Sequence, residues 1–193
     1  VARRPGGNQV VYPVAYTEQR DHRCNAVEVP ADIDDAIADK ARHIAQKSVD
    51  AVEGVGLIAV ELFEMPDGRV LVNELAPRPH NTGHYSIEGA ATSQFENHVR
   101  AVLDWPLGDP SLRTPVAVMV NVLGRREGTP TATTGLPRAL DTEVVTPHIY
   151  RKPDVRPGRK MGHVTALGPD RADTLNRGEH AARDTALESL RHG

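Results

Sequence analysis

Two glutamates in the first half of the chain have the type and the spacing to bind a metal ion together. An apolar run leads into Glu61, and a second apolar run, residues 70–72, leads into Asn73 and Glu74. The turn-forming sequence Pro66-Asp67-Gly68 lies between the two runs. Apolar, β-branched runs on either side of such a turn predict an antiparallel β-hairpin.

The length of the turn decides which residues of the hairpin face each other. A two-residue turn that starts at Asp67 puts Glu61 directly opposite Glu74. A two-residue turn that starts one position earlier puts Glu61 opposite Val72, with Glu74 as its diagonal neighbour on the same face. Both registers bring the two carboxylates within roughly 5–8 Å of each other. A three-residue loop would instead place Asn73 opposite Glu61.

The two carboxylates lie on an otherwise apolar hairpin face, where burying them is costly unless a cation compensates their charge. Carboxylate and amide oxygens, with few imidazoles and no thiol nearby, suit Mg²⁺, which usually also takes oxygens from a phosphate. The alternative is a solvated face on which Glu61 and Glu74 are ordinary surface residues, because carboxylates are mostly exposed.

A polar loop, residues 76–84, follows the hairpin. It carries Arg78, His80, Asn81 and His84, together with Pro77, Pro79 and Gly83. Proline fixes the backbone φ angle and lowers the entropy cost of holding neighbouring side chains in place. A loop that presents a cation and several hydrogen-bond donors beside a metal suits an anionic substrate.

The second half of the chain contains a basic turn. Lys152, Arg156, Arg159 and Lys160 place four cations within nine positions, around Pro157 and Gly158. Arginine can contact a phosphate through two nitrogens and lysine acts as a point charge, so this concentration suits a phosphomonoester. A solvated basic loop is the alternative.

Composition limits the class of protein. The chain has 193 residues and a formal net charge of −3, which argues against general nucleic-acid or membrane affinity. It shows no signal peptide and no apolar run near 18 residues. The single Cys24 excludes an intrachain disulfide framework and is typical of a reducing cytoplasm, where we expect the protein.

The pattern predicts an α+β fold. Residues 1–108 are expected to form an antiparallel sheet with covering helices, and this sheet should include the extended stretch 17–29. Residues 109–169 are expected to form a small β-rich module, and residues 170–193 a terminal helix and tail.

Two helices are expected in the first domain. One begins at the N-cap Asp32 and stops at Gly54, and the second runs from Gln94 to Asp104 after a cap at Thr92 or Ser93. The side chains expected to face inward on the second helix are Phe95, Val99 and Val102.

Three of these stretches together resemble one family. The sequences AVELF, NELAPRPHNTGHY and RPGRKMGHV are similar to those of the N5-carboxyaminoimidazole ribonucleotide synthetases of purine biosynthesis, which belong to the ATP-grasp superfamily. The resemblance runs from about Val1 to about Gly168. It implies that residues 1–108 are the second half of an ATP-grasp domain and that the small module is the C-terminal domain. Family members carry an adenine-binding first half before this point, so the chain looks like a fragment.

The resemblance also implies a reaction. Bicarbonate attacks the γ-phosphate of ATP to give carboxyphosphate, and the amine of 5-aminoimidazole ribonucleotide takes the carboxyl group. ATP and Mg²⁺ are the implied cofactors, and the enzyme is expected to be a homodimer.

By position, the resemblance implies that Glu61 and Glu74 bind Mg²⁺, that Asn73 and Glu74 contact ATP, and that Gln19 is a nucleotide contact. It also implies that Arg78 and His80 lie at the carboxyphosphate, that Asn81 lies near the imidazole, and that Lys152 and Arg159 bind the ribonucleotide 5′-phosphate. Gln19 stands where most relatives have a histidine, and a solvated strand edge is its alternative. The resemblance assigns no role to His84, Arg156 or Lys160.

Three alternatives remain open. Another ATP-grasp ligase, of the formate-dependent glycinamide ribonucleotide transformylase or biotin carboxylase type, would share the hairpin but fits the loop and the basic turn less well. The chain could instead be a non-catalytic piece that binds a phosphate or dimerises. A metallohydrolase would use His80, His84 and Glu74, although the loop lacks the helical H-x-x-x-H spacing of such enzymes.

Overall fold

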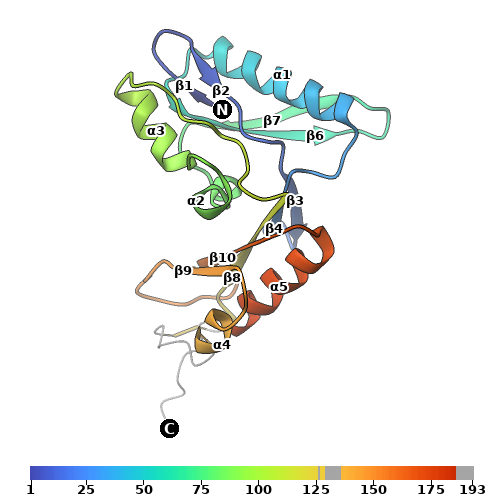
Figure 1. The fold of residues 1–193 in the computed structure, drawn as a ribbon, viewed down its shortest axis with the longest axis vertical. Coiled ribbons are helices and arrows are strands. Elements are labelled where there is room, and N and C mark those ends of the chain that lie inside the picture. The colour runs from blue at the N-terminus through green and yellow to red at the C-terminus, as the bar shows by residue number, and fades with distance from the viewer. Residues whose placement is uncertain (126, 129–135, 186–193) are drawn as a thin grey trace. The chain divides into compact units, whose positions relative to one another are not determined.

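The computed structural model describes residues 1–125, 127–128 and 136–185, which divide into two compact units (Figure 1). The first unit is formed by residues 1–16 and 29–113, and the second by residues 17–28 and the described residues from 114 onward. The tail expected at residues 186–193 lies outside the described residues. No described helix is both long and apolar enough to span a bilayer.

The first unit contains a short antiparallel sheet, a β-hairpin and covering helices. The sheet has the order β2-β1-β5, with β1 at Ala2–Arg3, β2 at Gln9–Val10 and β5 at Gly56–Leu57. The hairpin consists of β6, Ala59–Glu64, and β7, Val70–Ala76. The helices are α1, Asp35–Ala51; η1, Asn81–Gly83; α2, Ser86–Gly89; and α3, Gln94–Val102. Helix α1 lies along the hairpin (Figure 1).

Helix α1 begins later than the sequence predicts. Its N-cap is Asp34 and not Asp32, because the carbonyl oxygen of Asp34 accepts the first helical hydrogen bonds, from the amides of Ile37 and Ala38 at 2.9 Å each. Several acids stand at this end, and each has the chemistry of a cap, so the sequence alone could not choose among them. The buried face of α1 carries Ala41, Ala45 and Val49, at the spacing of an amphipathic helix.

Helix α3 has its expected cap but the opposite face turned inward. The hydroxyl of Ser93 accepts a hydrogen bond from the amide of Glu96 at 3.2 Å, which confirms a cap at this position. The apolar residues expected inside are exposed instead, with exposed fractions of 40% for Phe95, 49% for Val99 and 49% for Val102. The residues that α3 buries are Gln94, Asn97 and Ala101.

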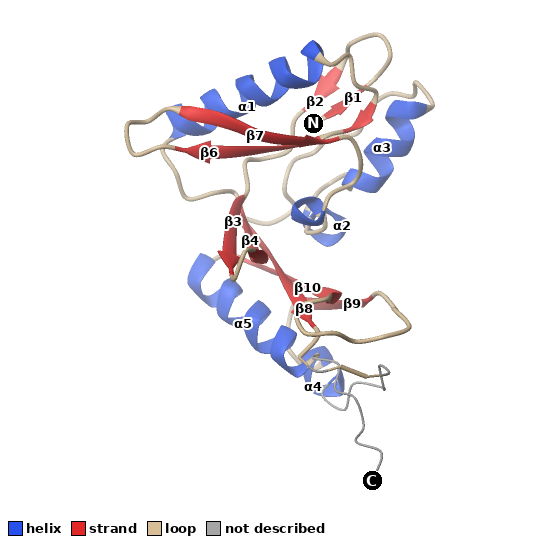
Figure 2. Cartoon of the chain, turned by 180° about the vertical axis from the view of Figure 1, so that it is seen from behind, coloured by secondary structure: helices blue, strands red, loops and turns tan. Residues whose placement is uncertain are grey.

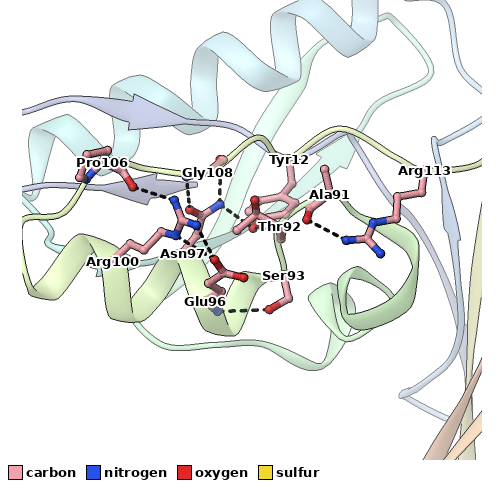
Figure 3. A network of polar contacts seen from close by, with 10 residues as sticks. All are labelled: Tyr12, Ala91, Thr92, Ser93, Glu96, Asn97, Arg100, Pro106, Gly108 and Arg113. Atoms are coloured by element: carbon pink, nitrogen blue, oxygen red, sulfur yellow. Dashed lines mark hydrogen bonds and ion pairs between the residues drawn. The ribbon is translucent and has the colours of Figure 1, made fainter.

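Hydrogen bonding explains why the polar face of α3 is buried (Figure 3). The side chain of Asn97 donates to the Tyr12 hydroxyl at 2.9 Å and to the carbonyl of Gly108 at 3.1 Å, and it accepts from the amide of Gly108 at 2.8 Å. Tyr12 in turn donates to the carbonyl of Thr92 at 2.8 Å. Burial raises the pKa of Tyr12 to about 12, so the phenol remains a neutral donor. These bonds fix α3 against the segments that precede and follow it.

The second unit is a five-stranded sheet with helices packed on it (Figure 2). The strand order is β3-β4-β8-β10-β9, and β10 is antiparallel to both of its neighbours. The strands are β3, Tyr16–Arg20; β4, Arg23–Val29; β8, Val116–Leu123; β9, Val145–Ile149; and β10, Lys160–Gly168. The helices are α4, Leu136–Leu140, and α5, Arg171–Asp184. Helix α5 packs on β8 and β10, and Gly178 allows this close approach because a Cβ there would lie 3.2 Å from Val120.

This division differs from the domains expected from the sequence in two places. Residues 17–28 were assigned to the first domain, but β4 lies beside β8 in the sheet of the second unit. The buried side chain of Asn121 donates to the carbonyl of Cys24 at 2.9 Å, and Ala26 belongs to the same core cluster as Val118. The terminal helix α5 is likewise part of the second unit. Contacts between segments far apart in the chain, strand pairing for β4 and helix packing for α5, leave no local sequence signal, which explains both differences.

The buried face of α3 can be tested by comparing two substitutions on that helix. Asn97→Ala leaves Tyr12 and both backbone groups of Gly108 without their partner, and we expect it to lower the free energy of unfolding by about 2–4 kcal/mol. Val99→Ala, on the exposed face, should change it by less than about 1 kcal/mol. Urea unfolding followed by the fluorescence of Trp105 measures both. A larger loss for Val99→Ala would show that the apolar face is the buried one.

Candidate functional site

The hairpin loop has three residues. The amide of Met65 donates to the carbonyl of Arg69 at 2.8 Å, which closes the loop around Pro66, Asp67 and Gly68. Gly68 has a φ of +75°, a left-handed conformation that glycine adopts without steric cost. Of the three turns considered from the sequence, this is the one that would place Asn73 opposite Glu61.

A β-bulge in strand β7 changes this register at the carboxylates. Leu62 pairs with Val72, whereas Glu61 pairs with Glu74, so Asn73 is the extra residue between the two pairs. In a regular strand, Asn73 and Glu74 would point to opposite faces. Here the side-chain amide of Asn73 donates to Glu61 at 3.3 Å, although Glu74 is the residue that faces Glu61. The bulge therefore brings all three polar side chains together.

His80 completes this group, which we call the carboxylate cluster: Glu61, Asn73, Glu74 and His80. One potential ligand atom each from Glu61, Glu74 and His80 lies within 4.8 Å of the other two. The Nε2 atom of His80 is 3.6 Å from a carboxylate oxygen of Glu61. Its Nδ1 atom lies 3.0 Å from the hydroxyl of Thr82. The sequence therefore predicted the members of the cluster, but not the bulge that assembles them.

Gln94 fixes the loop that carries His80. Its side chain accepts a hydrogen bond from the amide of His80 at 3.0 Å and donates to the carbonyl of the same residue at 2.8 Å. It also lies 2.9 Å from Nδ1 of His84. Gln94 is only 2% exposed, and Gly83 leaves room for it, since a Cβ on Gly83 would lie 2.4 Å from its oxygen. Gln94 is not predicted as a site residue from the sequence, in which its only signal is its place at the start of a helix.

The cluster fits a divalent cation. Among the described residues, no lysine or arginine forms an ion pair with Glu61 or Glu74, and the basic side chain beside them is the imidazole of His80. Two carboxylates suit Mg²⁺, and the imidazole beside them would also suit Mn²⁺ or Zn²⁺. The metallohydrolase set is not favoured, because the cluster contains Glu61 where that set needs His84. The ring of His84 instead lies 5.5 Å from that of Phe95.

Arg78 and Asn81 flank His80 in the same loop. Arg78 is exposed, and its guanidinium donates to the carbonyl of Pro79 at 3.1 Å. Asn81 is partly buried at the start of η1, and its carbonyl accepts from the amide of His84 at 3.1 Å. The loop thus carries an arginine, an imidazole and an amide within residues 78–81.

Two apolar side chains on the hairpin were also missed. Phe63 pairs with Leu71, and their exposed fractions are 55% and 41%. Because side chains alternate along a strand, Phe63 lies on the same face of β6 as Glu61. An exposed apolar pair beside charged ligands is suited to covering the flat ring of a ligand. The sequence signal was the two-residue spacing between Glu61 and Phe63.

The remaining predicted site residues belong to the second unit. Gln19 is exposed on β3. Lys152 lies with its Nζ atom 5.6 Å from the centre of the Tyr150 ring. Arg159 forms an ion pair and a hydrogen bond with Asp154, which also pairs with Arg156 at 2.6 Å.

Asp154 therefore neutralises part of the basic turn. Partial desolvation raises the pKa of Asp154, but the hydrogen bond from Arg159 and the charges of Arg156 and Arg159 outweigh it and hold the pKa below that of an ordinary aspartate. The sequence contained this acid among the cations, and its role became visible only in the structure.

Comparisons with known families match both units. The ATP-grasp domain family matches residues 1–95, and the phosphoribosylaminoimidazole carboxylase C-terminal domain family matches residues 117–177.

Several relatives are named N5-carboxyaminoimidazole ribonucleotide synthase. The chain is 46% identical over 193 residues to the N5-carboxyaminoimidazole ribonucleotide synthase of Mycobacterium tuberculosis, covering 94% of this chain and 43% of that protein. It is 42% identical over 180 residues to the synthase of Synechocystis, covering 87% and 45% of the two chains. The chain thus spans about half the length of the curated relatives it matches.

Solved structures agree with these relatives. The crystal structure of N5-carboxyaminoimidazole ribonucleotide synthetase from Thermotoga maritima matches with a TM-score of 0.88 and 42% identity, over 98% of this chain and 51% of that one. The synthase from Aspergillus clavatus, in complex with ADP and 5-aminoimidazole ribonucleotide, matches with a TM-score of 0.81 and 37% identity, over 89% and 46% of the two chains.

Metal binding by the cluster can be tested with Mn²⁺ as the probe. We expect added Mn²⁺ to broaden the NMR signals of Asn73 and His80 selectively. Glu61→Gln and Glu74→Gln should each weaken Mn²⁺ binding at least about tenfold, because each removes one charged ligand. Glu64→Gln is the matched control, since Glu64 lies on the other face of the same strand. An equal loss in the control would argue against the cluster as the metal site.

The charge balance of the basic turn can be tested through the titration of Asp154. Because its pKa is lower in the folded chain, the ion pairs stabilise the fold above the pKa of the unfolded state, and this stabilisation is lost as the pH falls through the folded value. Arg159→Ala should raise the pKa of Asp154 toward the ordinary value, as measured by NMR of the carboxyl carbon. Arg138→Ala, at a side chain 74% exposed in the same unit, should leave it unchanged.

Proposed function

Because the chain belongs to the N5-carboxyaminoimidazole ribonucleotide synthetase family, within the ATP-grasp superfamily, we propose that it takes part in the ATP- and Mg²⁺-dependent carboxylation of 5-aminoimidazole ribonucleotide by bicarbonate. The observation that carries this proposal is the carboxylate cluster, in which a bulge at Asn73 sets Glu61 against Glu74 with His80 beside them. Two paired carboxylates without a lysine or arginine partner among the described residues, next to a basic, hydrogen-bonding loop, suit a reaction between phosphates and bicarbonate.

The reaction proceeds in two steps. An oxygen of bicarbonate forms a bond to the γ-phosphorus of ATP, the bond between that phosphorus and the bridging oxygen breaks, and ADP leaves. The amine of the ribonucleotide then bonds to the carboxyl carbon of the carboxyphosphate, directly or after release of CO₂. Inorganic phosphate leaves, and the amine loses a proton. Neither step needs a protein nucleophile, so the residues act by neutralising charge and by holding the reactants in place.

In the first unit, Glu61 and Glu74 would hold the metal ion, which when bound supplies neutralisation of the phosphate charges. Asn73, whose side-chain amide donates to Glu61 at 3.3 Å, would contact ATP or the metal. Arg78 supplies a positive charge for bicarbonate and the carboxyphosphate. His80, held through its backbone by Gln94, would orient the same group by hydrogen bonding.

Other residues would bind the organic parts of the substrates. Asn81 is proposed to lie near the imidazole, and the exposed pair Phe63 and Leu71 offers an apolar surface for the nucleotide base. In the second unit, Lys152 and Arg159 are proposed to bind the 5′-phosphate of the ribonucleotide, and Gln19 to contact the nucleotide. The A. clavatus synthase was solved with ADP and 5-aminoimidazole ribonucleotide, which supports both classes of ligand here.

The other ATP-grasp ligases are less well supported. A glycinamide ribonucleotide transformylase or a biotin carboxylase would share the metal-binding hairpin, but the relatives at 46% and 42% identity are named as synthases of N5-carboxyaminoimidazole ribonucleotide. A homodimer and a cytoplasmic location also belong to this proposal.

A second candidate function is binding of the ribonucleotide phosphate without binding of ATP. It is suggested by the second unit, in which Lys152 and Arg159 lie in one basic turn. Such a chain would act as the substrate-binding part of the enzyme.

Calorimetric titration of the purified chain separates these candidates. We expect 5-aminoimidazole ribonucleotide to bind, with an affinity at least about tenfold weaker in Lys152→Ala because a charged phosphate contact is lost. Mg-ATP should bind more weakly to Glu74→Ala, while Arg138→Ala should leave both affinities unchanged. If the ribonucleotide binds and Mg-ATP does not, the result supports the second candidate function, in which the chain is the substrate-binding part of the enzyme. Failure of both ligands to bind would show that this chain does not carry the proposed sites.

A further inference from the structure

We propose that Tyr150 is a positioning residue that holds the Lys152 ammonium in place for the ribonucleotide 5′-phosphate. This inference rests on the proposed role of Lys152 and adds to it a residue that neither the sequence motifs nor the comparisons assign. Three observations carry it. The Lys152 ammonium lies over the Tyr150 ring, the Tyr150 hydroxyl contacts a buried histidine, and the backbone of Tyr150 is bonded to strand β10.

The first contact is between Lys152 and the face of the Tyr150 ring. The Nζ atom lies 5.6 Å from the ring centre, which is within the distance of a cation–π interaction. A lysine side chain has four flexible carbons, and ordering it on a bound phosphate costs conformational entropy. A ring that already restricts the ammonium lowers that cost before the ligand arrives.

The second contact fixes the ring itself. The hydroxyl of Tyr150 lies 2.8 Å from Nδ1 of His163, a residue that is only 2% exposed. The ring of His163 is stacked on that of His148, with centres 4.4 Å apart and planes 14° from parallel. His148 and His163 are partners across β9 and β10. The orientation of the tyrosine is therefore set by side chains anchored in the sheet.

The third observation connects this arrangement to Arg159. The amide of Tyr150 donates to the carbonyl of Met161 at 2.9 Å, so Tyr150 continues the pairing of β9 with β10. Strand β10 begins at Lys160, directly after Arg159. The carbonyl of Arg159 accepts from the amide of Gly124 at 2.8 Å. Lys152 thus lies over a ring whose backbone is bonded to β10, and Arg159 directly precedes β10 with its own backbone bonded to Gly124.

A positioning role for Tyr150 predicts how its contribution to the free energy of ligand binding depends on other groups. If Tyr150 acts by positioning Lys152, its effect requires both the lysine and the phosphate of the ligand. A purely structural role would instead weaken binding of every ligand and would persist when the lysine is removed. A double-mutant cycle separates these cases.

The test measures binding of 5-aminoimidazole ribonucleotide, and of its nucleoside without the phosphate, by titration of the full chain. Tyr150→Leu, which removes the ring, should weaken ribonucleotide binding roughly 3- to 10-fold, as expected for a lost cation–π contact. Tyr150→Phe keeps the ring and should restore most of the affinity. In the Lys152→Ala background, Tyr150→Leu should cause no further loss, and neither variant should change nucleoside binding. Tyr16→Leu, at an exposed tyrosine, is the control for tyrosine removal.

A second measurement needs no substrate. The NMR signals of the Lys152 ε-methylene should be shifted upfield by the ring current in the unmodified chain and in Tyr150→Phe, and should return to ordinary positions in Tyr150→Leu. Folding of each variant is checked by its amide spectrum.

The outcomes distinguish the inference from the function on which it rests. If Lys152→Ala weakens ribonucleotide binding but Tyr150→Leu does not, the positioning role is wrong and the phosphate site stands. If Tyr150→Leu still weakens binding in the absence of Lys152, the residue acts on the fold and the inference is also wrong. If Lys152→Ala has no effect, or the unmodified chain does not bind the ribonucleotide, the proposed phosphate site fails and the inference fails with it.

Discussion

Two like charges held against each other are the constraint on which the first unit depends. Glu61 and Glu74 are direct partners across the hairpin, and carboxylates in that position repel. A regular hairpin with this three-residue loop would have separated them, because Asn73 would then face Glu61. The bulge instead brings the charges together and adds the Asn73 amide beside them. Such a costly arrangement is stabilised when a cation offsets the repulsion, which is why we propose that the cluster binds a metal ion and phosphates.

The rest of the first unit supports this group through polar contacts. Helix α3 turns Gln94 and Asn97 inward, where an ordinary amphipathic helix would bury Phe95 and Val99. Gln94 satisfies the backbone of the His80 loop, and Asn97 satisfies the backbone of Gly108. Buried amides with several partners define one geometry more narrowly than apolar contacts do, because each bond has a required direction. The helix thus serves to position the loops around it.

The sequence was sufficient for the local features and insufficient for those that depend on distant partners. The apolar runs and the Pro-Asp-Gly turn predicted the hairpin, and Ser93 was correctly considered as a cap. The bulge at Asn73 was not predictable, because an asparagine in a strand has the same local pattern with or without it. Periodicity gave the wrong face of α3, since it counts apolar residues and ignores the partners that Asn97 finds in Tyr12 and Gly108. The placement of residues 17–28 failed for a similar reason, because β4 pairs with a strand nearly a hundred residues later.

The two units differ in how their clustered charges are balanced, negative in the first unit and positive in the second. In the first, the described residues pair no lysine or arginine with the two glutamates, so much of their charge is left for a ligand to balance. In the second, Asp154 lies between Arg156 and Arg159 and reduces their mutual repulsion. A basic turn that carries its own carboxylate can hold its shape without a ligand, but an incoming phosphate must then compete with Asp154 for Arg159. Lys152 lies on an aromatic ring instead, and a ring competes far less with phosphate than a carboxylate does. In the proposed phosphate site, Lys152 would therefore bind the phosphate with less competition than Arg159, which makes the position of the lysine ammonium important for binding.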